Sequence, residues 1–140
     1  MWLLVEDDEN DAILLERALK RVDADARLQW VQDGDAAKQY LLGTPPFQDR
    51  AAFPMPFVIL SDLKMPRCSG LELVQWIRQD PRFQLMPFVM FSSSDQPSDV
   101  ALAYQDGANW YLAKPPTFAG LVETLGRLAE NLSASVWKTA

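Results

Sequence analysis

The chain has 140 residues, a net charge of −6 and 49% hydrophobic residues, as expected for one soluble globular domain. The negative charge argues against general nucleic-acid binding, since that function needs basic residues that contact phosphates. The sequence contains no histidine, which excludes serine–histidine catalytic triads, histidine-ligated metal sites and phosphohistidine carriers within this chain. Its single cysteine, Cys68, excludes an internal disulfide bond. No apolar run or basic leader predicts a membrane span or a signal peptide, so we expect a cytoplasmic location.

The first part of the chain alternates apolar runs with helical patterns. Residues 2–5 form an apolar run that predicts a strand. Residues 15–22 then carry apolar side chains at the i, i+3, i+4, i+7 spacing of an amphipathic helix. Residues 28–31 predict a second strand and residues 36–42 a short helix. Residues 43–56 contain four prolines and therefore predict a loop.

The second part repeats the alternation. Residues 57–60 are apolar at every position, which is typical of a strand covered by helices on both faces. The later elements are a helix over 70–79, a strand over 88–91, a helix from Pro97, a strand over 110–113 and a helix from Thr117 with Leu121, Leu125, Leu128 and Leu132 on one stripe. Strict alternation of strands and helices predicts an α/β fold, a doubly wound five-stranded parallel sheet with helices on both faces.

Polar side chains follow four of the predicted strands. Glu6 and Asp7 follow the first strand, Asp62 lies just beyond the third, Ser92 follows the fourth and Lys114 follows the fifth. In an open parallel sheet the ligand site forms at the carboxyl ends of the strands. We therefore expect the acids, the hydroxyl and the lysine to converge on one edge of the sheet.

This set of side chains suits a divalent cation and a phosphoryl group. Carboxylates that lie together repel one another unless a cation sits between them, and Mg²⁺ prefers oxygen ligands. Glu6, Asp7 and Asp62 carry three negative charges, which Mg²⁺ and Lys114 would balance. Hydroxyl and ammonium groups donate to phosphoryl oxygens, and a carboxylate can take the group as an aspartyl phosphate. The pattern predicts magnesium-dependent phosphoryl transfer.

Four motifs in this order resemble the receiver domains of two-component response regulators over essentially the whole chain. They are Val5-Glu6-Asp7-Asp8, then Asp62-Leu63-Lys64-Met65-Pro66 with Ser69-Gly70-Leu71-Glu72, then Phe91-Ser92, then Gly107-Ala108-Asn109 with Tyr111 and Lys114-Pro115. The resemblance implies a single receiver domain over residues 1–140, with the flavodoxin-like strand order 2-1-3-4-5. It also implies that a sensor histidine kinase is the partner.

The resemblance implies a role for each acidic residue of the site. Asp62 is the expected phosphoacceptor. Asp7 and Asp62 are expected to bind Mg²⁺ directly, and Glu6 to act largely through water. The backbone carbonyl of Lys64 is the third expected protein ligand.

The resemblance also implies the residues of the switch. Lys114 is expected to pair with the phosphoryl group, and its bond to Pro115 to be cis, which would aim the lysine inward. Ser92 is expected to move toward the phosphoryl group, and Tyr111 to change its packing in response. Ser92 stands where threonine is commoner in the family. Ser94, two residues later, stands where side chains tune the lifetime of the phosphoryl group.

The expected function is a phosphorylation-dependent switch that is not an enzyme beyond its own phosphorylation and dephosphorylation. Since the chain ends one helix after Lys114, its output is expected to be a protein contact; a phosphorelay intermediate or phosphate sink is the alternative. A haloacid-type phosphatase is rejected because Asp62-Leu63-Lys64 lacks a second acid. A phosphorylation-independent pseudo-receiver is disfavoured but not rejected, because Glu6, Asp7, Asp62 and Lys114 are all present.

Four further features complete the expectations. The proline-rich loop and residues 92–95 resemble a bacterial subgroup that serves phytochrome-type histidine kinases. Cys68 is expected to be passive. Val136 and Trp137 are expected to cover a partner surface. Homodimerisation is left open by the sequence.

Overall fold

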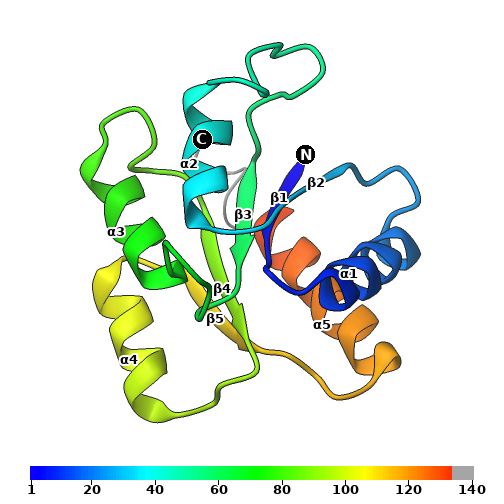
Figure 1. The fold of residues 1–140 in the computed structure, drawn as a ribbon. Coiled ribbons are helices and arrows are strands. Elements are labelled where there is room, and N and C mark those ends of the chain that lie inside the picture. Colours follow the sequence, from blue (N-terminus) through cyan, green and yellow to red (C-terminus); the bar gives the residue numbers. More distant parts are fainter. Residues whose placement is uncertain (134–140) are drawn as a thin grey trace.

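The computed structural model describes residues 1–133. Its centre is one sheet of five parallel strands in the order β2-β1-β3-β4-β5, which confirms both the predicted fold and the strand order (Figure 1). The strands are β1 (Trp2–Val5), β2 (Leu28–Val31), β3 (Val58–Ser61), β4 (Phe88–Ser92) and β5 (Trp110–Ala113). The central strands β1, β3 and β4 are buried along their whole length, as expected for a sheet with two covered faces.

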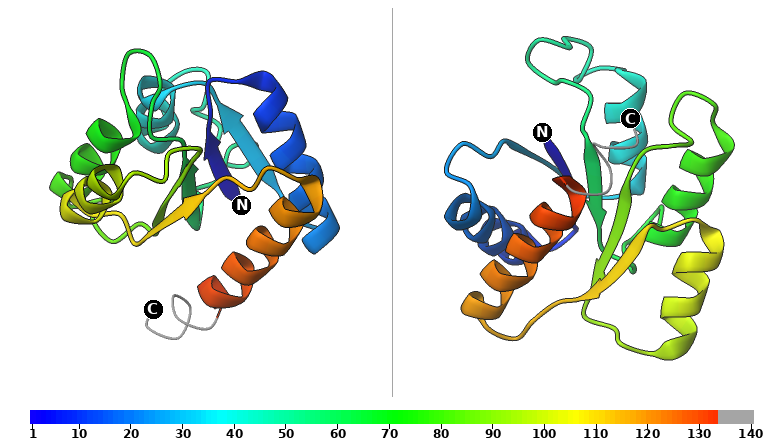
Figure 2. Two further views of the ribbon diagram at one scale, coloured as in Figure 1. Left: turned by 90° about the horizontal axis from the view of Figure 1, so that it is seen from below. Right: turned by 180° about the vertical axis from the view of Figure 1, so that it is seen from behind.

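Five helices cover the two faces of the sheet. They are α1 (Glu9–Val22), α2 (Gly34–Leu42), α3 (Gly70–Gln79), α4 (Pro97–Asp106) and α5 (Phe118–Asn131). Helices α1 and α5 lie on one face, and α2, α3 and α4 lie on the other (Figures 1 and 2). Each face has its own hydrophobic core, and the sheet separates the two. Within residues 1–133, none of the helices is long and apolar enough to cross a membrane.

Polar caps place the starts of two helices directly beside the carboxyl edge of the sheet. The Asp8 side chain accepts hydrogen bonds from the backbone N–H groups of Asn10 and Asp11, so α1 begins one short turn after β1. Ser69 and Glu72 form a reciprocal capping box at the start of α3. These caps fix the short connections after β1 and β3, which carry the acids of the predicted site.

The observed boundaries differ from the sequence pattern at a few residues. Strands β3 and β4 extend to Ser61 and Ser92, because Ser61 pairs with Val5 and Ser92 with Ala113. Helix α2 begins at Gly34, since Asp33 caps it by accepting from the N–H of Ala36. The predicted stripe of α5 is buried at Leu125, Leu128 and Leu132 and half-buried at Leu121. Val136 and Trp137 lie outside the described residues.

Residues 43–56 form the predicted loop, and one arginine pins it to α2. The Arg50 guanidinium donates to the carbonyls of Tyr40 and Leu41 at 2.8 and 2.7 Å, and to that of Phe53 at 3.2 Å. The carbonyls of Tyr40 and Leu41 lie at the end of a helix, where intrahelical partners run out. The loop is therefore tied to the molecule far from the carboxyl edge of the sheet.

Candidate functional site

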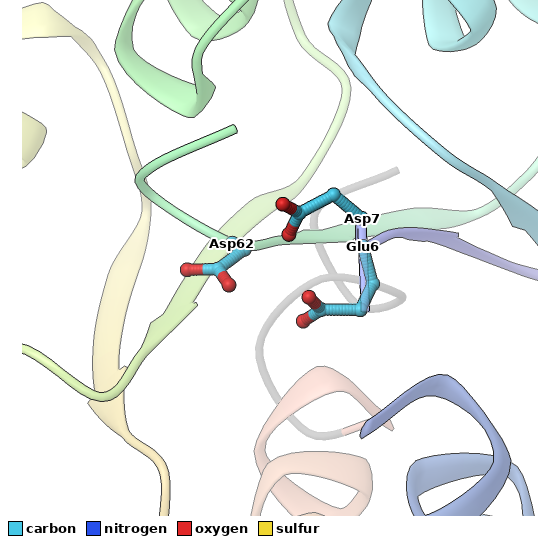
Figure 3. Close-up of side chains that lie close together, drawn as sticks. All are labelled: Glu6, Asp7 and Asp62. Carbon is cyan, nitrogen blue, oxygen red and sulfur yellow. The ribbon is translucent and has the colours of Figure 1, made fainter. Parts of the chain in front are cut away.

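Three carboxylates lie together at the carboxyl edge of the sheet. Glu6 and Asp7 follow β1 and Asp62 follows β3, and these two strands are neighbours in the sheet. One oxygen from each side chain lies within 4.8 Å of the others. Figure 3 shows the three side chains converging from the two strand ends. The structure thus brings together the acids that the sequence predicted.

Lys114, which follows the edge strand β5, bridges two of these acids at the same carboxyl edge of the sheet. Its ammonium group donates to Glu6 Oε2 at 2.7 Å and to Asp62 Oδ2 at 3.0 Å. It also lies 3.3 Å from Asp11 Oδ2, on the first turn of α1. Lys114 follows β5, whose last residue pairs with Ser92 of β4. The lysine therefore reaches across the end of β4 to meet the acids.

Burial and pairing set the charges of this group. Glu6 is only 2% exposed, and burial raises its pKa to about 7, although the hydrogen bond from Lys114 opposes that rise. Burial also acts to lower the pKa of Lys114. The hydrogen bond to Glu6 and the charge of Asp62 outweigh it and hold that pKa above the ordinary lysine value. Lys114 is therefore a charged donor at neutral pH.

The backbone around Asp62 is held tightly, and this fixes its carboxylate. The N–H of Asp62 donates to the carbonyl of Val5 at 3.0 Å, and the N–H of Leu63 donates to Asp62 Oδ1 at 2.6 Å. Gly70 packs directly on the carbonyl of Asp62, where a Cβ atom would collide with the oxygen. The glycine of the Ser69-Gly70 motif is thus required by the close approach of α3 to the strand end.

A second group of side chains lies beside Asp62 in the loop after β4. The buried Ser92 hydroxyl accepts from the N–H of Ser94 at 3.2 Å. The Ser94 hydroxyl donates to Asp99 Oδ2 at 2.6 Å, and the Ser94 carbonyl accepts from the Tyr111 hydroxyl at 2.7 Å. Ser94 therefore connects the predicted switch residue Ser92 to α4 and β5. A hollow of about 370 Å³ separates this loop from Asp62 and is lined by Asp62, Lys64 and residues 92–96.

One sequence prediction about the site is wrong. The bond between Lys114 and Pro115 is trans, and the cis bond in the described residues joins Pro45 to Pro46. A cis bond is not needed to aim Lys114 inward, because its side chain already reaches Glu6 and Asp62 from the end of β5.

Two residues of the site were missed by the sequence analysis. Asp11 contacts Lys114, and the indole N–H of Trp30 donates to the backbone carbonyl of Glu6 at 2.7 Å. A partial signal existed for Asp11, which is an acid in the first turn of the helix that follows Glu6 and Asp7. Cys68 is buried, and burial raises the pKa of its thiol, which fits the expectation that it is passive.

The donor set fits a hard divalent cation. All three side chains in the cluster offer carboxylate oxygens. Because Asp7 is exposed and Asp62 is half-buried, a cation could enter the site from solvent. Glu6 is already committed on both oxygens, to the N–H of Asp8 and to Lys114. This pairing favours contact between the Glu6 carboxylate and a cation through water rather than by direct coordination.

Residues 2–126 match the family described as the response regulator receiver domain. The chain belongs to this family. Members of the family bind Mg²⁺, are phosphorylated by histidine kinases and act as signal switches rather than general enzymes.

Two relatives illustrate the range of the family. The chain is 33% identical to the probable methanogenesis regulatory protein FilR2 of Methanothrix harundinacea, over 91% of this chain and 80% of that protein. It is 34% identical to the response regulator Rcp1 of Synechocystis sp., over 80% of this chain and 74% of that protein.

Three solved structures resemble the chain along nearly its whole length. Response regulator RPA3017, from red-light signalling of R. palustris, has a TM-score of 0.88 and 33% identity, and covers 93% of this chain and 91% of its own. The phosphorylated cyanobacterial phytochrome response regulator RcpA has a TM-score of 0.84 and 27% identity, with coverage of 96% and 94%. The Mn²⁺-bound form of Rcp1 has a TM-score of 0.79 and 31% identity, with coverage of 91% and 89%.

Proposed function

We propose that this receiver domain accepts a phosphoryl group on Asp62 from a sensor histidine kinase, in a reaction that requires Mg²⁺. The observation that carries the proposal is the position of the Asp62 carboxylate. One of its oxygens accepts from Lys114 at 3.0 Å, while the acids Glu6 and Asp7 lie beside it. One site thus combines the three groups that phosphoryl transfer requires. They are a nucleophilic oxygen on Asp62, the ammonium group of Lys114 and carboxylate oxygens that could bind a metal ion.

The proposed step exchanges one bond to phosphorus for another. A carboxylate oxygen of Asp62 forms a bond to the phosphorus atom while the bond from phosphorus to the kinase histidine nitrogen breaks. The electron pair of the broken bond stays on the imidazole nitrogen. Lys114, and Ser92 after a movement of its loop, would donate hydrogen bonds to the phosphoryl oxygens. The product is an aspartyl phosphate, and its hydrolysis by water resets the domain.

Asp7, Asp62 and the backbone carbonyl of Lys64 would hold the Mg²⁺ ion, with Glu6 acting through water. The bound ion would neutralise charge on the phosphoryl oxygens. The residues of the chain then have separate tasks: Asp62 supplies the nucleophile, Lys114 pairs with the phosphoryl group, and Asp7 orients the reacting centre. The Mn²⁺-bound form of Rcp1 supports a divalent cation in this family.

Phosphorylation is proposed to act as a switch through the surface formed by α4, β5 and α5. The observation that favours a switch is the chain of hydrogen bonds from Ser92 through Ser94 to Tyr111 on β5 and Asp99 on α4. A movement of Ser92 toward a phosphoryl group would break the first of these bonds and so act on both elements. A phosphorelay intermediate or phosphate sink remains the second candidate, because it needs the same acceptor site.

The proposed partner is a histidine kinase of the phytochrome type. RcpA is a phytochrome response regulator and RPA3017 belongs to red-light signalling, which supports this choice. FilR2, by contrast, is a probable methanogenesis regulatory protein, so the similar proteins are not all described as light-signalling regulators. The phytochrome-type partner is therefore proposed separately from the phosphoryl-transfer reaction. A single domain over residues 1–140, in the cytoplasm, also belongs to this proposal.

The reaction is tested by measuring intact protein mass after incubation with Mg²⁺ and a small acyl phosphate. We expect the wild type to gain one phosphoryl group, and Asp62→Asn to gain none. Asp95→Asn is the matched control, because Asp95 is an exposed acid that lines the same hollow. A gain of mass by Asp62→Asn equal to that of the wild type would overturn the assignment of the acceptor. Omission of Mg²⁺ with added chelator should abolish the gain.

Hydrogen exchange before and after phosphorylation separates a switch from a sink. A switch predicts changed amide exchange in α4 and β5 of the phosphorylated protein. A sink predicts unchanged exchange in both elements, together with rapid return of the phosphoryl group to a histidine-containing protein.

A further inference from the structure

Trp30 makes a hydrogen bond that the strand pattern does not require. It lies on β2, the edge strand next to β1, and its half-buried ring packs on the α1 and α5 side of the sheet. Its indole N–H donates to the backbone carbonyl of Glu6 at 2.7 Å. The last backbone pair of these two strands is Val5 with Val31, so Glu6 lies just beyond the ladder. The side chain of Trp30 therefore extends the contact between the strands into the turn that carries the acids.

The bond completes the fixation of Glu6. The N–H of Glu6 donates to the carbonyl of Val31 at 3.0 Å. Its two carboxylate oxygens accept from the N–H of Asp8 at 3.1 Å and from Lys114 at 2.7 Å. With the bond from Trp30, every backbone and side-chain polar group of Glu6 has a partner.

The bond also acts on the residue that follows. The carbonyl of Glu6 and the N–H of Asp7 belong to the same planar peptide group, so the direction of one fixes the direction of the other. Asp7 itself is exposed and leads directly into the Asp8 cap of α1. The hydrogen bond from the Trp30 indole thus fixes the orientation of the Glu6–Asp7 peptide plane. That plane leads into Asp7, the residue with which the chain would bind a cation.

We propose that Trp30 is a positioning residue for the divalent-cation site, acting through the Glu6–Asp7 peptide and without contact to the ion. This inference rests on the proposed function, because it assumes that Asp7 binds Mg²⁺. Residues that orient metal ligands from outside the coordination shell affect metal affinity by about 10- to 100-fold. Trp30 orients a ligand through the backbone, so we expect the lower end of that range.

The test compares Trp30→Phe, which keeps an aromatic ring and removes the N–H donor, with Trp110→Phe. Trp110 is the matched control because it is a half-buried tryptophan that packs in the same core from β5, the opposite edge strand, and its indole has no hydrogen bond in the described part of the chain. Isothermal titration calorimetry with Mg²⁺ gives the dissociation constant of each protein. We expect about tenfold weaker binding by Trp30→Phe and a change below about twofold in Trp110→Phe.

The outcomes separate this inference from the proposed function. If the wild type binds no Mg²⁺, the proposed function fails. If the wild type binds and Trp30→Phe binds equally well, or if both variants weaken equally, the positioning role is overturned.

A readout on the wild-type protein keeps the test independent of how the variants fold. The indole ¹H–¹⁵N signal of Trp30 is assigned by triple-resonance and NOE experiments on the wild-type protein itself. We expect this signal to shift as Mg²⁺ is added, because its acceptor carbonyl precedes a metal ligand, and the signal of Trp110 to stay in place. A Trp30 signal that does not move in a titration where the protein binds Mg²⁺ would overturn the inference.

Discussion

The carboxyl edge of the sheet has two halves that are built differently. The acidic turn, residues 6–8, is held by bonds from β2, from Lys114 just after β5 and from the first turn of α1, and each polar group of Glu6 has a partner. The serine loop, residues 92–96, is largely exposed beyond Ser92 and depends on the few bonds that meet at Ser94. The half that would bind the cation is thus arranged in advance. The half that would follow the phosphoryl group has few bonds to break.

This difference matches what each half would have to do. A metal site gains affinity when its ligands are already in place, because no ordering is needed at the moment of binding. A switch instead needs an element with two arrangements of similar free energy. The Ser92 hydroxyl accepts from the N–H of Ser94 at 3.2 Å, the long end of the usual range, and this bond would be lost if the hydroxyl moved to donate to a phosphoryl oxygen.

The largest expected effect comes from Lys114, the residue that contacts both Glu6 and Asp62. Lys114→Met keeps much of the side-chain volume and removes the ammonium donor. We expect phosphorylation by an acyl phosphate to slow by about 100-fold, as for other preorganised donors to a reacting oxygen. The rate is followed by intact mass over time. Lys20→Met, at an exposed lysine in the last turn of α1, is the control. A rate for Lys114→Met within twofold of the wild type would show that the ammonium group does not assist the transfer.

A smaller effect is expected at Gly70, where α3 approaches the strand end between the two halves. An added Cβ would collide with the carbonyl of Asp62 and lie 2.9 Å from Met90 Sδ. We expect Gly70→Ala to lower the free energy of unfolding by about 1–3 kcal/mol, as measured by urea denaturation.

Gly126→Ala is the matched control for this substitution. Gly126 lies inside α5, and its added Cβ would have Val22 Cγ2 as its nearest neighbour at 3.9 Å. That variant should be unchanged or up to about 1 kcal/mol more stable, because alanine favours the helix. Equal stability of the two variants would mean that the strand end relaxes around the new methyl group.

The position of the main site residues could be predicted from the sequence because they follow strand ends directly. Parallel strands bring their carboxyl ends to one edge, so Asp62 and Lys114 had to approach each other once the strands were identified. Trp30 could not be found in this way. It is an ordinary aromatic in a strand pattern, and its role depends on how far its ring reaches beyond the last backbone pair.

Other features depended on details of packing that a linear pattern does not contain. Asp11 reaches Lys114 only because α1 begins so soon after β1, and Arg50 pins its loop through three carbonyls. The predicted cis bond before Pro115 came from the family resemblance, and the side chain of Lys114 reaches the acids without it. The chemical roles of all the predicted site residues stay predictions: Glu6, Asp7, Asp62, Lys64, Ser92, Tyr111 and Lys114.

The smallest expected effect tests whether the two halves act independently. Tyr111→Phe removes the hydroxyl that donates to the Ser94 carbonyl at 2.7 Å and leaves the ring in place. A net contribution of about 0.5–1.5 kcal/mol for this bond predicts amide exchange in residues 93–96 that is faster by up to about tenfold. The Mg²⁺ dissociation constant should stay within about twofold of the wild type, since Tyr111 contacts neither Glu6 nor Asp7 and Glu6 keeps all its partners.

Trp30→Phe should show the opposite pattern, with weaker Mg²⁺ binding and unchanged exchange in residues 93–96. Hydrogen exchange monitored by mass spectrometry and calorimetry on the same two variants give both readouts. If Tyr111→Phe weakened Mg²⁺ binding as much as Trp30→Phe, the serine loop and the acidic turn would form one coupled unit. The cation would then act on the switch directly, before any phosphoryl group is present.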